Sequence, residues 1–111
     1  MSLRHYETLF ILKPTLSDEE KATIVENIKN VIAQKDGEVV AVDNIGVREL
    51  AYPINKFERG HYYIVYYKAP GDAVLELERQ MRYNEELLKF MTVKYESKKD
   101  IKRWEEMSKN V

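Results

Sequence analysis

The chain of 111 residues has no cysteine and only two histidines, His5 and His61. Without cysteine there is no disulfide and no thiolate chemistry. Neither histidine belongs to a Ser/His/Asp order, a glycine-rich phosphate loop or a spaced set of metal ligands, and a lone histidine at the start of a strand is usually a packing residue. The sequence therefore predicts no catalytic site, no metal and no cofactor.

Long hydrophobic runs are also missing. No stretch approaches the roughly 20 apolar residues that a membrane helix needs, and residues 1–12 lack the basic start, apolar centre and cleavage site of a signal peptide. We expect a cytoplasmic protein without a membrane partner or a small-molecule substrate. The composition, 44% hydrophobic and 33% charged, is typical of a soluble domain, and 111 residues are enough for one core.

The apolar pattern predicts a strand followed by a helix at the start of the chain. Residues Arg4 to Leu12 are predicted to form a strand. In its second half, the side chains on both faces of the strand are apolar, which indicates a central strand with both faces covered. Ser17, followed three residues later by Glu20, is a capping-box pattern, and apolar residues from Ile24 to Ile32 recur on one helical face. Gly37 is expected to end this helix.

A glycine and a proline divide the next part of the chain. Gly46 lies in a run of β-branched residues and predicts a bulge in a second strand that begins at Glu38. Proline has no N–H for a ladder, so Pro53 should end the pairing near Tyr52. Residues 53–60 are then expected to connect to a third strand over residues 61–68, again apolar on both parities.

The remaining pattern completes the expected fold. A turn at residues 70–72 with Asp72 as the cap leads into a helix that buries Leu77 and Met81, and residues 87–95 form a last strand. The order predicts an α+β, ferredoxin-like β-α-β-β-α-β fold, with two helices on one face of a four-stranded antiparallel sheet and the other face free. Residues 1–96 form this domain, and residues 97–111 form a charged C-terminal tail.

One segment suggests RNA binding. Residues Arg59 to Tyr66 partly match the RNP pattern of RNA-recognition modules, with Tyr63 and Tyr66 at aromatic positions, whereas His61 and Tyr62 do not fit. Phe10 on the first strand is the candidate for the matching aromatic, and bases stack on such side chains across an open sheet face. For any individual tyrosine, packing and strand propensity are the favoured explanation. The net charge of −1 argues against a strong RNA binder acting alone.

Several short motifs occur in collinear order between residue 3 and about residue 95. They are Gly46, Arg48, Leu50-Ala51-Tyr52-Pro53-Ile54 and Lys56, together with His5-Tyr6-Glu7, Pro14, Gly60-His61-Tyr62, Ala69-Pro70 and Arg82-Tyr83-Asn84-Glu85. Together they resemble the bacterial small-subunit ribosomal protein S-six (S6) family. Family members often carry a second base beside Arg48, whereas Val47 and Glu49 flank it here, so the local positive charge is weaker. The segment after Tyr95 has no counterpart in the resemblance.

The resemblance implies a function. Members of this family dock beside another small-subunit ribosomal protein, S-eighteen (S18), and the pair binds a junction of small-subunit ribosomal RNA. It implies a non-enzymatic constituent of the small ribosomal subunit that binds this RNA together with S18 and supports subunit assembly and translation. A basic partner would also explain the near-neutral charge of this chain.

Two other functions remain open from the sequence. The first is an RNA-recognition-type module that binds single-stranded RNA on a tyrosine-rich sheet face. The second is a small-molecule-binding or regulatory domain, which shares the fold but needs an apolar pocket.

Residues near RNA or partner follow from the resemblance by position. They are Arg4, His5, Tyr6, Arg48, Lys56, Arg82 and Asn84, and we add Arg59 from the expected connection. Arginine makes forked contacts to phosphate, which suits such a role. For each of these residues, an ordinary surface or packing role is the alternative.

The tail allows two interpretations. Five bases outnumber three acids in residues 97–111, and Ile101, Trp104 and Met107 recur close to helical spacing. A helix this short is marginal alone and needs a surface on which to bury that stripe. Either the tail orders on the partner or the RNA, with Trp104 as its apolar anchor and Lys98 and Lys99 near phosphate, or it docks as a terminal helix on the chain's own sheet.

Overall fold

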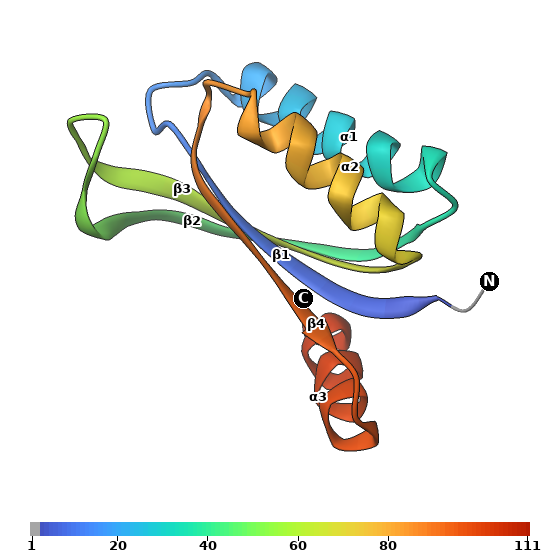
Figure 1. Cartoon of the computed structure of the whole chain (residues 1–111). Helices are drawn as coiled ribbons and strands as arrows, with labels where there is room; N and C mark the ends of the chain where they lie inside the picture. The colour runs from blue at the N-terminus through green and yellow to red at the C-terminus, as the bar shows by residue number, and fades with distance from the viewer. Residues whose placement is uncertain (1–2) are drawn as a thin grey trace.

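The computed structural model describes residues 3–111, and its elements follow the predicted order with one addition (Figure 1). They are β1 (Arg4–Leu12), α1 (Asp18–Gln34), β2 (Glu38–Ile54), β3 (Phe57–Ala69), α2 (Gly71–Arg82), β4 (Leu87–Tyr95) and α3 (Lys98–Lys109). The strands form one antiparallel sheet in the order β2-β3-β1-β4. The predicted ferredoxin-like fold is confirmed, and α3 is added to it. Within the described part of the chain, no helix combines the length and the apolar character needed to cross a membrane.

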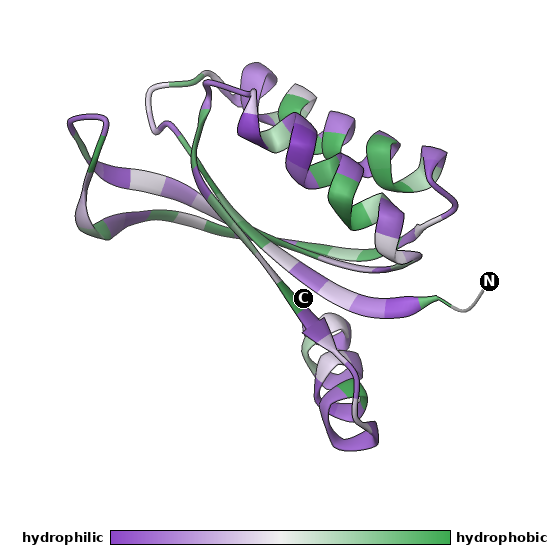
Figure 2. Ribbon diagram, viewed as in Figure 1, coloured by the Kyte–Doolittle hydropathy of each residue, from purple (hydrophilic) through white to green (hydrophobic). Residues whose placement is uncertain are grey.

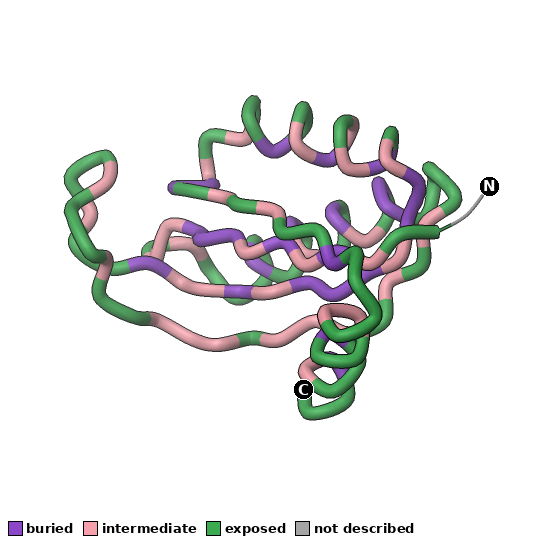
Figure 3. The backbone as a smooth tube through the Cα atoms, turned by 60° about the horizontal axis from the view of Figure 1, so that its bottom comes forward, coloured by how far each residue is buried: buried purple, intermediate pink, exposed green. Residues whose placement is uncertain are grey.

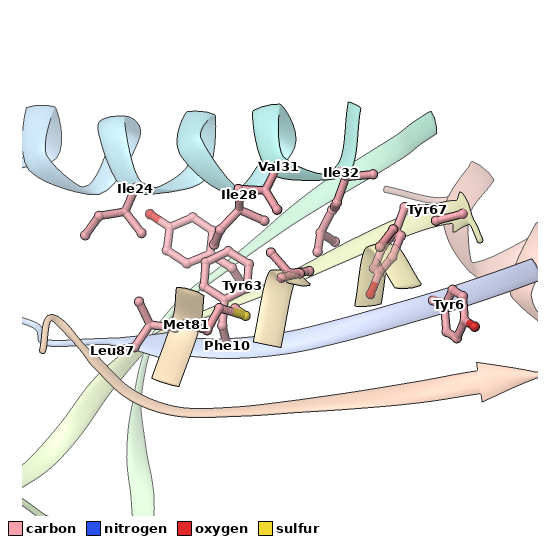
Figure 4. Close-up of a cluster of buried hydrophobic side chains, with 14 of the residues drawn as sticks. Tyr6, Phe10, Ile24, Ile28, Val31, Ile32, Tyr63, Tyr67, Met81 and Leu87 are labelled. Carbon is pink, nitrogen blue, oxygen red and sulfur yellow. The ribbon is translucent and has the colours of Figure 1, made fainter. Parts of the chain in front are cut away.

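β1 and β3 lie at the centre of the sheet, as their two-sided apolar patterns predicted. Their register places Phe10 opposite Tyr63 and Tyr6 opposite Tyr67. These side chains belong to the core under α1 and α2, which cover one face of the sheet (Figure 4). The rings of Phe10 and Tyr63 stack with their centroids 5.2 Å apart, and Ile32 of α1 is completely buried in the same core.

α1 begins with the capping box that the sequence predicted. The Ser17 hydroxyl accepts a hydrogen bond from the Glu20 backbone N–H at 3.1 Å, and the Glu20 carboxylate accepts one from the Ser17 N–H at 3.0 Å. The prediction for the other end was less accurate, because the positive φ of 63° belongs to Asp36 and not to Gly37. Gly37 is required for space instead, since a Cβ there would lie 2.6 Å from Ile32 Cγ2.

The start of α2 also differs from the prediction. Pro70 occupies the N-cap position without a side-chain hydrogen bond, and Asp72 lies inside the first turn, so Asp72 is not the cap. A carboxylate in this turn is still favoured by the helix dipole. Leu77 and Met81 are buried as expected.

β2 and β3 form a long hairpin that projects from one end of the molecule (Figure 1). Gly46 has a φ of 104°, and the register with β3 shifts between Asn44 and Gly46. The predicted bulge is therefore confirmed.

The turn of this hairpin is shorter than predicted, and the expected connection over residues 53–60 is wrong. Only Asn55 and Lys56 separate the strands, with φ values of 49° and 70°. Two positive φ values in a two-residue loop are typical of a type I′ turn, which returns the chain directly. Pro53 is tolerated within β2 because β2 is an edge strand and needs no outer ladder partner.

α3 packs on the face of the sheet opposite α1 and α2 (Figure 1). It is mainly hydrophilic along its length (Figure 2), but its buried side forms a second apolar cluster in which Trp104 meets Tyr66 and Tyr95. Trp104 is 1% exposed, and its Nε1 donates a hydrogen bond to the Tyr6 carbonyl oxygen at 2.8 Å. The outer face of the sheet is thus only partly free. Of the two interpretations of the tail, the structure has the helix docked on its own sheet.

Candidate RNA and partner interface

The residues that the sequence placed near RNA or partner lie in four separate parts of the fold. Arg4, His5 and Tyr6 are on β1; Arg48, Lys56 and Arg59 are on the β2–β3 hairpin; Arg82 and Asn84 are at the end of α2; and Lys98, Lys99 and Trp104 are on α3. They do not form a single cluster. Their exposure and contacts separate those that a partner can reach from those already used in packing.

His5, Tyr6 and Trp104 are brought together, but by packing. The His5 ring meets Trp104 edge to face with centroids 4.8 Å apart, and Tyr6 is buried against Tyr67. Burial, and then the nearby charge of Lys68, lowers the pKa of His5. The side chains of His5 and Trp104 and the Tyr6 backbone carbonyl thus hold α3 on the sheet, whereas the Tyr6 side chain lies in the main core on the other face. Of the β1 group only Arg4 is exposed.

The three residues of the hairpin group are exposed, and the outer part of the hairpin is exposed or intermediate along most of its length (Figure 3). Arg48 Nη1 donates a hydrogen bond to the Val47 carbonyl oxygen at 2.9 Å. None of the ion pairs within residues 3–111 involves Arg48, Lys56 or Arg59. Their charges are therefore free to meet phosphate groups.

The two residues at the end of α2 have different roles. The Asn84 side-chain oxygen accepts a hydrogen bond from the Glu86 backbone N–H at 2.9 Å, so Asn84 shapes the connection to β4. Arg82 is exposed. The end of α2 that carries Arg82 lies toward the same end of the molecule as the hairpin (Figure 1).

A groove on the outer face of the sheet was not predicted. The register between β2 and β3 is regular up to Glu49 opposite Arg59 and resumes at Ile54 opposite Phe57. Residues 50–53 therefore include extra residues on β2 and leave the regular ladder. Together with the outer face they enclose a hollow of ≈ 150 Å³, which is lined by Leu9, Ile11, Leu50, Ala51, Tyr52, Ile54, Tyr62, Lys89, Phe90 and Met91.

Tyr52 and Lys89 meet across this groove. Lys89 Nζ donates a hydrogen bond to the Tyr52 hydroxyl at 3.0 Å and lies 5.3 Å from the centre of its ring. The hydrogen bond with Tyr52 raises the pKa of Lys89. Tyr52 is nevertheless 55% exposed, and Met91 is 51% exposed. The groove thus combines an apolar floor, accessible apolar rims and one cation.

Two signals in the sequence point toward this groove. β1 is apolar on both parities, which places Leu9 and Ile11 on the outer face, and Met91 and Val93 alternate along β4. Neither signal indicates that residues 50–53 leave the ladder, because that depends on the long-range register of the hairpin. None of the residues that line the groove was therefore predicted as a binding residue, and Leu50 to Ile54 were singled out only as a family motif.

The aromatic pair expected of an RNA-recognition module faces the core. Phe10 is 0% exposed and Tyr63 is 6% exposed, and both lie under the helices (Figure 4). Bases cannot stack on them. The residues that alternate with Phe10 and Tyr63 along β1 and β3 point to the outer face of the sheet. On that face, α3 covers Tyr66. The geometry does not support the single-stranded RNA module.

The groove is also small for a metabolite. Its ≈ 150 Å³ compares with about 300–1,000 Å³ for typical small-molecule sites. Within residues 3–111, no group of three or more metal-ligating side chains is placed to hold an ion.

Comparison with known proteins assigns the family. The model of the family described as "Ribosomal protein S6" matches residues 5–94. The chain belongs to the ribosomal protein S6 family. It is 61% identical over 105 residues to small ribosomal subunit protein bS6 of Nitratiruptor, covering 95% of this chain and 82% of that protein. It is 49% identical over 109 residues to bS6 of Campylobacter hominis, covering 98% of this chain and 75% of that protein.

A solved structure of the same family has the same fold. The 30S ribosomal protein S6 of Thermotoga maritima aligns with a TM-score of 0.82 at 30% identity and covers 96% of this chain and 98% of its own. Members of the S6 family are structural proteins of the small ribosomal subunit, and the family is not one of enzymes. The motif Leu50 to Ile54, on which the resemblance rested, is the segment that forms one wall of the groove.

Proposed function

We propose that this S6 protein binds small-subunit ribosomal RNA in the cytoplasm together with S18, and that the pair supports assembly of the small subunit. The observation that carries the proposal is the apolar groove built by the family motif. Exposed Tyr52 and Met91 border it, and contiguous exposed apolar surface of this kind marks protein–protein contacts. S18 takes this groove, and its own positive charge supplies affinity for RNA that a chain of net charge −1 lacks.

The RNA contacts of this chain come from basic side chains that form no ion pair within the described residues. Arg48, Lys56 and Arg59 are exposed on the hairpin, and Arg82 is exposed at the same end of the molecule. Guanidinium groups make forked hydrogen bonds to phosphate, and structured RNA is recognised mainly by shape. Arg4 is the exposed base of β1 and joins this group as a peripheral contact.

The S18 contact is tested with two matched substitutions, Met91→Asp and Leu75→Asp. Met91 borders the groove, whereas Leu75 is 71% exposed on α2 and lies outside it. A carboxylate buried at an apolar interface is costly, so Met91→Asp should weaken binding of purified S18 by roughly tenfold or more. Leu75→Asp should change the dissociation constant less than about twofold. Equal effects of the two substitutions on S18 binding, measured by calorimetry, would refute the groove assignment.

The RNA contact is tested with Arg48→Ala and Arg82→Ala. Both residues are exposed, so the free energy of unfolding should change by less than about 0.5 kcal/mol. Binding to the small-subunit ribosomal RNA junction in the presence of S18 should weaken and become less dependent on salt, because fewer counterions are released. Unchanged binding of both variants would show that these residues are not RNA contacts.

A further inference from the structure

The positive charge of this chain is concentrated on α3. Residues 97–111 hold five bases and three acids, a net charge of +2, whereas the preceding 96 residues hold 13 bases and 16 acids, a net charge of −3. The most basic segment of an acidic protein is thus the helix that was added to the fold. This distribution favours a negatively charged partner for α3.

Docking of α3 leaves four of its five basic residues together on its exposed side. At about 100° per residue, Lys98, Lys102 and Lys109 fall within about 40° of one another around the helix axis, with Lys99 beside them. Trp104 points away from these lysines and packs against Tyr66 and Tyr95 of the sheet, and Ser108, next to it around the helix, is also buried. The four lysines, which we call the lysine face, are all exposed.

The acids of α3 neutralise only part of this face. Asp100 lies 3.7 Å from Arg103, at the side of the helix, and Glu105 is close enough to His5 to affect its pKa. At the same angular spacing, Glu105 and Glu106 both fall among the lysines. Within the described chain, none of the four lysines takes part in an ion pair. The four lysines and two glutamates therefore leave this face with an excess of two positive charges.

The helix is held rigidly enough to present these charges in a fixed pattern. The indole of Trp104 is buried and hydrogen-bonded to the Tyr6 carbonyl oxygen at 2.8 Å. The ring of Tyr95 lies 5.7 Å from the Arg103 guanidinium, and the Ser97 hydroxyl caps the first turn by accepting from the Asp100 N–H at 3.0 Å. A short isolated helix would be marginal in water, so docking is what gives the lysine face its shape.

We infer that the lysine face of α3 is a phosphate-backbone contact for ribosomal RNA, separate from the hairpin contacts and held in place by Trp104 as a positioning residue. The inference rests on the proposed function, and it adds a second RNA surface on the face of the sheet opposite α1 and α2. Four point charges without a forked hydrogen-bonding group or an exposed aromatic ring suit phosphates and do not read bases. The contact is therefore independent of sequence.

The test compares two double variants of the full chain. Lys102→Ala with Lys109→Ala removes two charges from the lysine face, and Lys29→Ala with Lys35→Ala removes two from α1 and its C-terminal end. Each is titrated with in vitro transcribed small-subunit ribosomal RNA and purified S18 at several salt concentrations. The α3 variant should bind more weakly and lower the slope of log K against log salt by about 1.5, because each lost phosphate contact removes about 0.7–0.9. The α1 variant should match the unaltered chain.

A second pair of variants tests the positioning role. Trp104→Ala keeps every lysine but removes the anchor of α3, so the salt slope should fall although the net charge is unchanged. Trp104→Phe keeps an aromatic ring in the cluster and should restore most of that slope. An unchanged slope for Trp104→Ala, with α3 shown by circular dichroism to have lost helix, would overturn the positioning role.

The outcomes separate the two proposals. If the unaltered chain shows no salt-dependent binding to RNA with S18, both the proposed function and the lysine face are refuted. If it binds and the α3 and α1 variants behave alike, only the lysine face is refuted. If the α3 variant loses affinity for S18 in the absence of RNA, the face contacts protein, and the assignment to RNA is wrong.

Discussion

Gly46 is a residue whose identity follows directly from its backbone. Its φ of 104° lies in the region that side chains with a Cβ rarely adopt. A Cβ would also approach Arg48 Nη1 at 3.2 Å, although that flexible side chain can move. The backbone and not the neighbouring side chain is therefore the constraint at this bulge.

Replacing Gly46 with Val should lower the free energy of unfolding by more than about 1 kcal/mol, because a β-branched residue is strained at this φ. Gly71→Ala is the control, since a Cβ there would make only ordinary contacts at 3.4 Å and 4.0 Å. Urea unfolding followed by circular dichroism measures both. A Gly46→Val chain as stable as the parent would mean that the glycine has no special backbone role.

Tyr67 is a second residue with a defined physical role, as part of a buried hydroxyl cluster. The Thr8 hydroxyl lies 2.9 Å from the Tyr67 hydroxyl and 2.9 Å from that of Thr92. Burial raises the pKa of Tyr67 to about 12. The hydrogen bonds from the two threonines oppose this shift but do not cancel it.

This shift predicts a loss of stability in alkali. An unfolded tyrosine titrates near 10, so the folded state holds the proton more tightly and its stabilising effect is complete below about pH 10. The free energy of unfolding should fall as the pH rises from about 10 to about 12, by an amount on the order of 2 kcal/mol from Tyr67. Urea unfolding at about pH 9 and about pH 11 measures the fall.

Tyr67→Phe is the control for this pH dependence. Burial also raises the pKa of Tyr63, Tyr66 and Tyr95, so the parent chain loses stability through several groups. The substitution removes only the Tyr67 contribution and leaves Thr8 and Thr92 bonded to each other. Equal pH slopes for the two chains would contradict the assignment to Tyr67.

At the scale of elements, α3 shows how a hydrophilic segment becomes part of a fold. Its apolar residues are few, and one of them, Trp104, supplies most of its anchor in the cluster with Tyr66 and Tyr95. A large aromatic side chain buries enough surface to hold a short segment in place. The remaining surface of α3 is free to carry charge.

The fluorescence of Trp104, the only tryptophan of the chain, should report this docking. We expect emission at short wavelength and weak quenching by acrylamide in the free protein, because the indole is 1% exposed. Addition of S18 and RNA should leave the spectrum nearly unchanged. Solvent-like emission that shifts to the blue only with partner and RNA would instead support ordering of the tail on its partner.

At the scale of the whole molecule, the two faces of the sheet have different roles. One face holds the main core under α1 and α2, and the other is shared between α3 and the groove. The proposed RNA and protein contacts use the hairpin, the groove and α3. A small chain thereby offers several surfaces while keeping one core.

The predicted domain boundary after residue 96 can be tested by truncating the chain there. A chain of residues 1–96 should still unfold cooperatively, because the core under α1 and α2 lies outside α3. Its free energy of unfolding should be lower by about 3 kcal/mol, as for the loss of a buried tryptophan. It should also self-associate at high concentration, seen by analytical ultracentrifugation, because Tyr66 and Tyr95 are uncovered. A truncated chain without a cooperative transition would show that α3 belongs to the domain.

The sequence alone determined the features that depend on neighbours along the chain. The two-sided apolar pattern of β1 and β3 identified the central strands, Ser17 and Glu20 identified the start of α1, and Gly46 identified the bulge. Periodicity, caps and backbone sterics act over a few residues, so they can be read from short segments. The family was visible for the same reason, because its motifs are short and collinear.

Only the tertiary structure decided which surface the candidate binding residues occupy. Phe10 and Tyr63 face the core and not RNA, residues 50–53 leave the ladder to form the groove, and Trp104 docks α3 on the chain's own sheet. Each outcome depends on contacts between residues far apart in the chain and on the area that other elements leave uncovered. A one-residue change of register moves every side chain of a strand to the other face, so local patterns cannot specify the site.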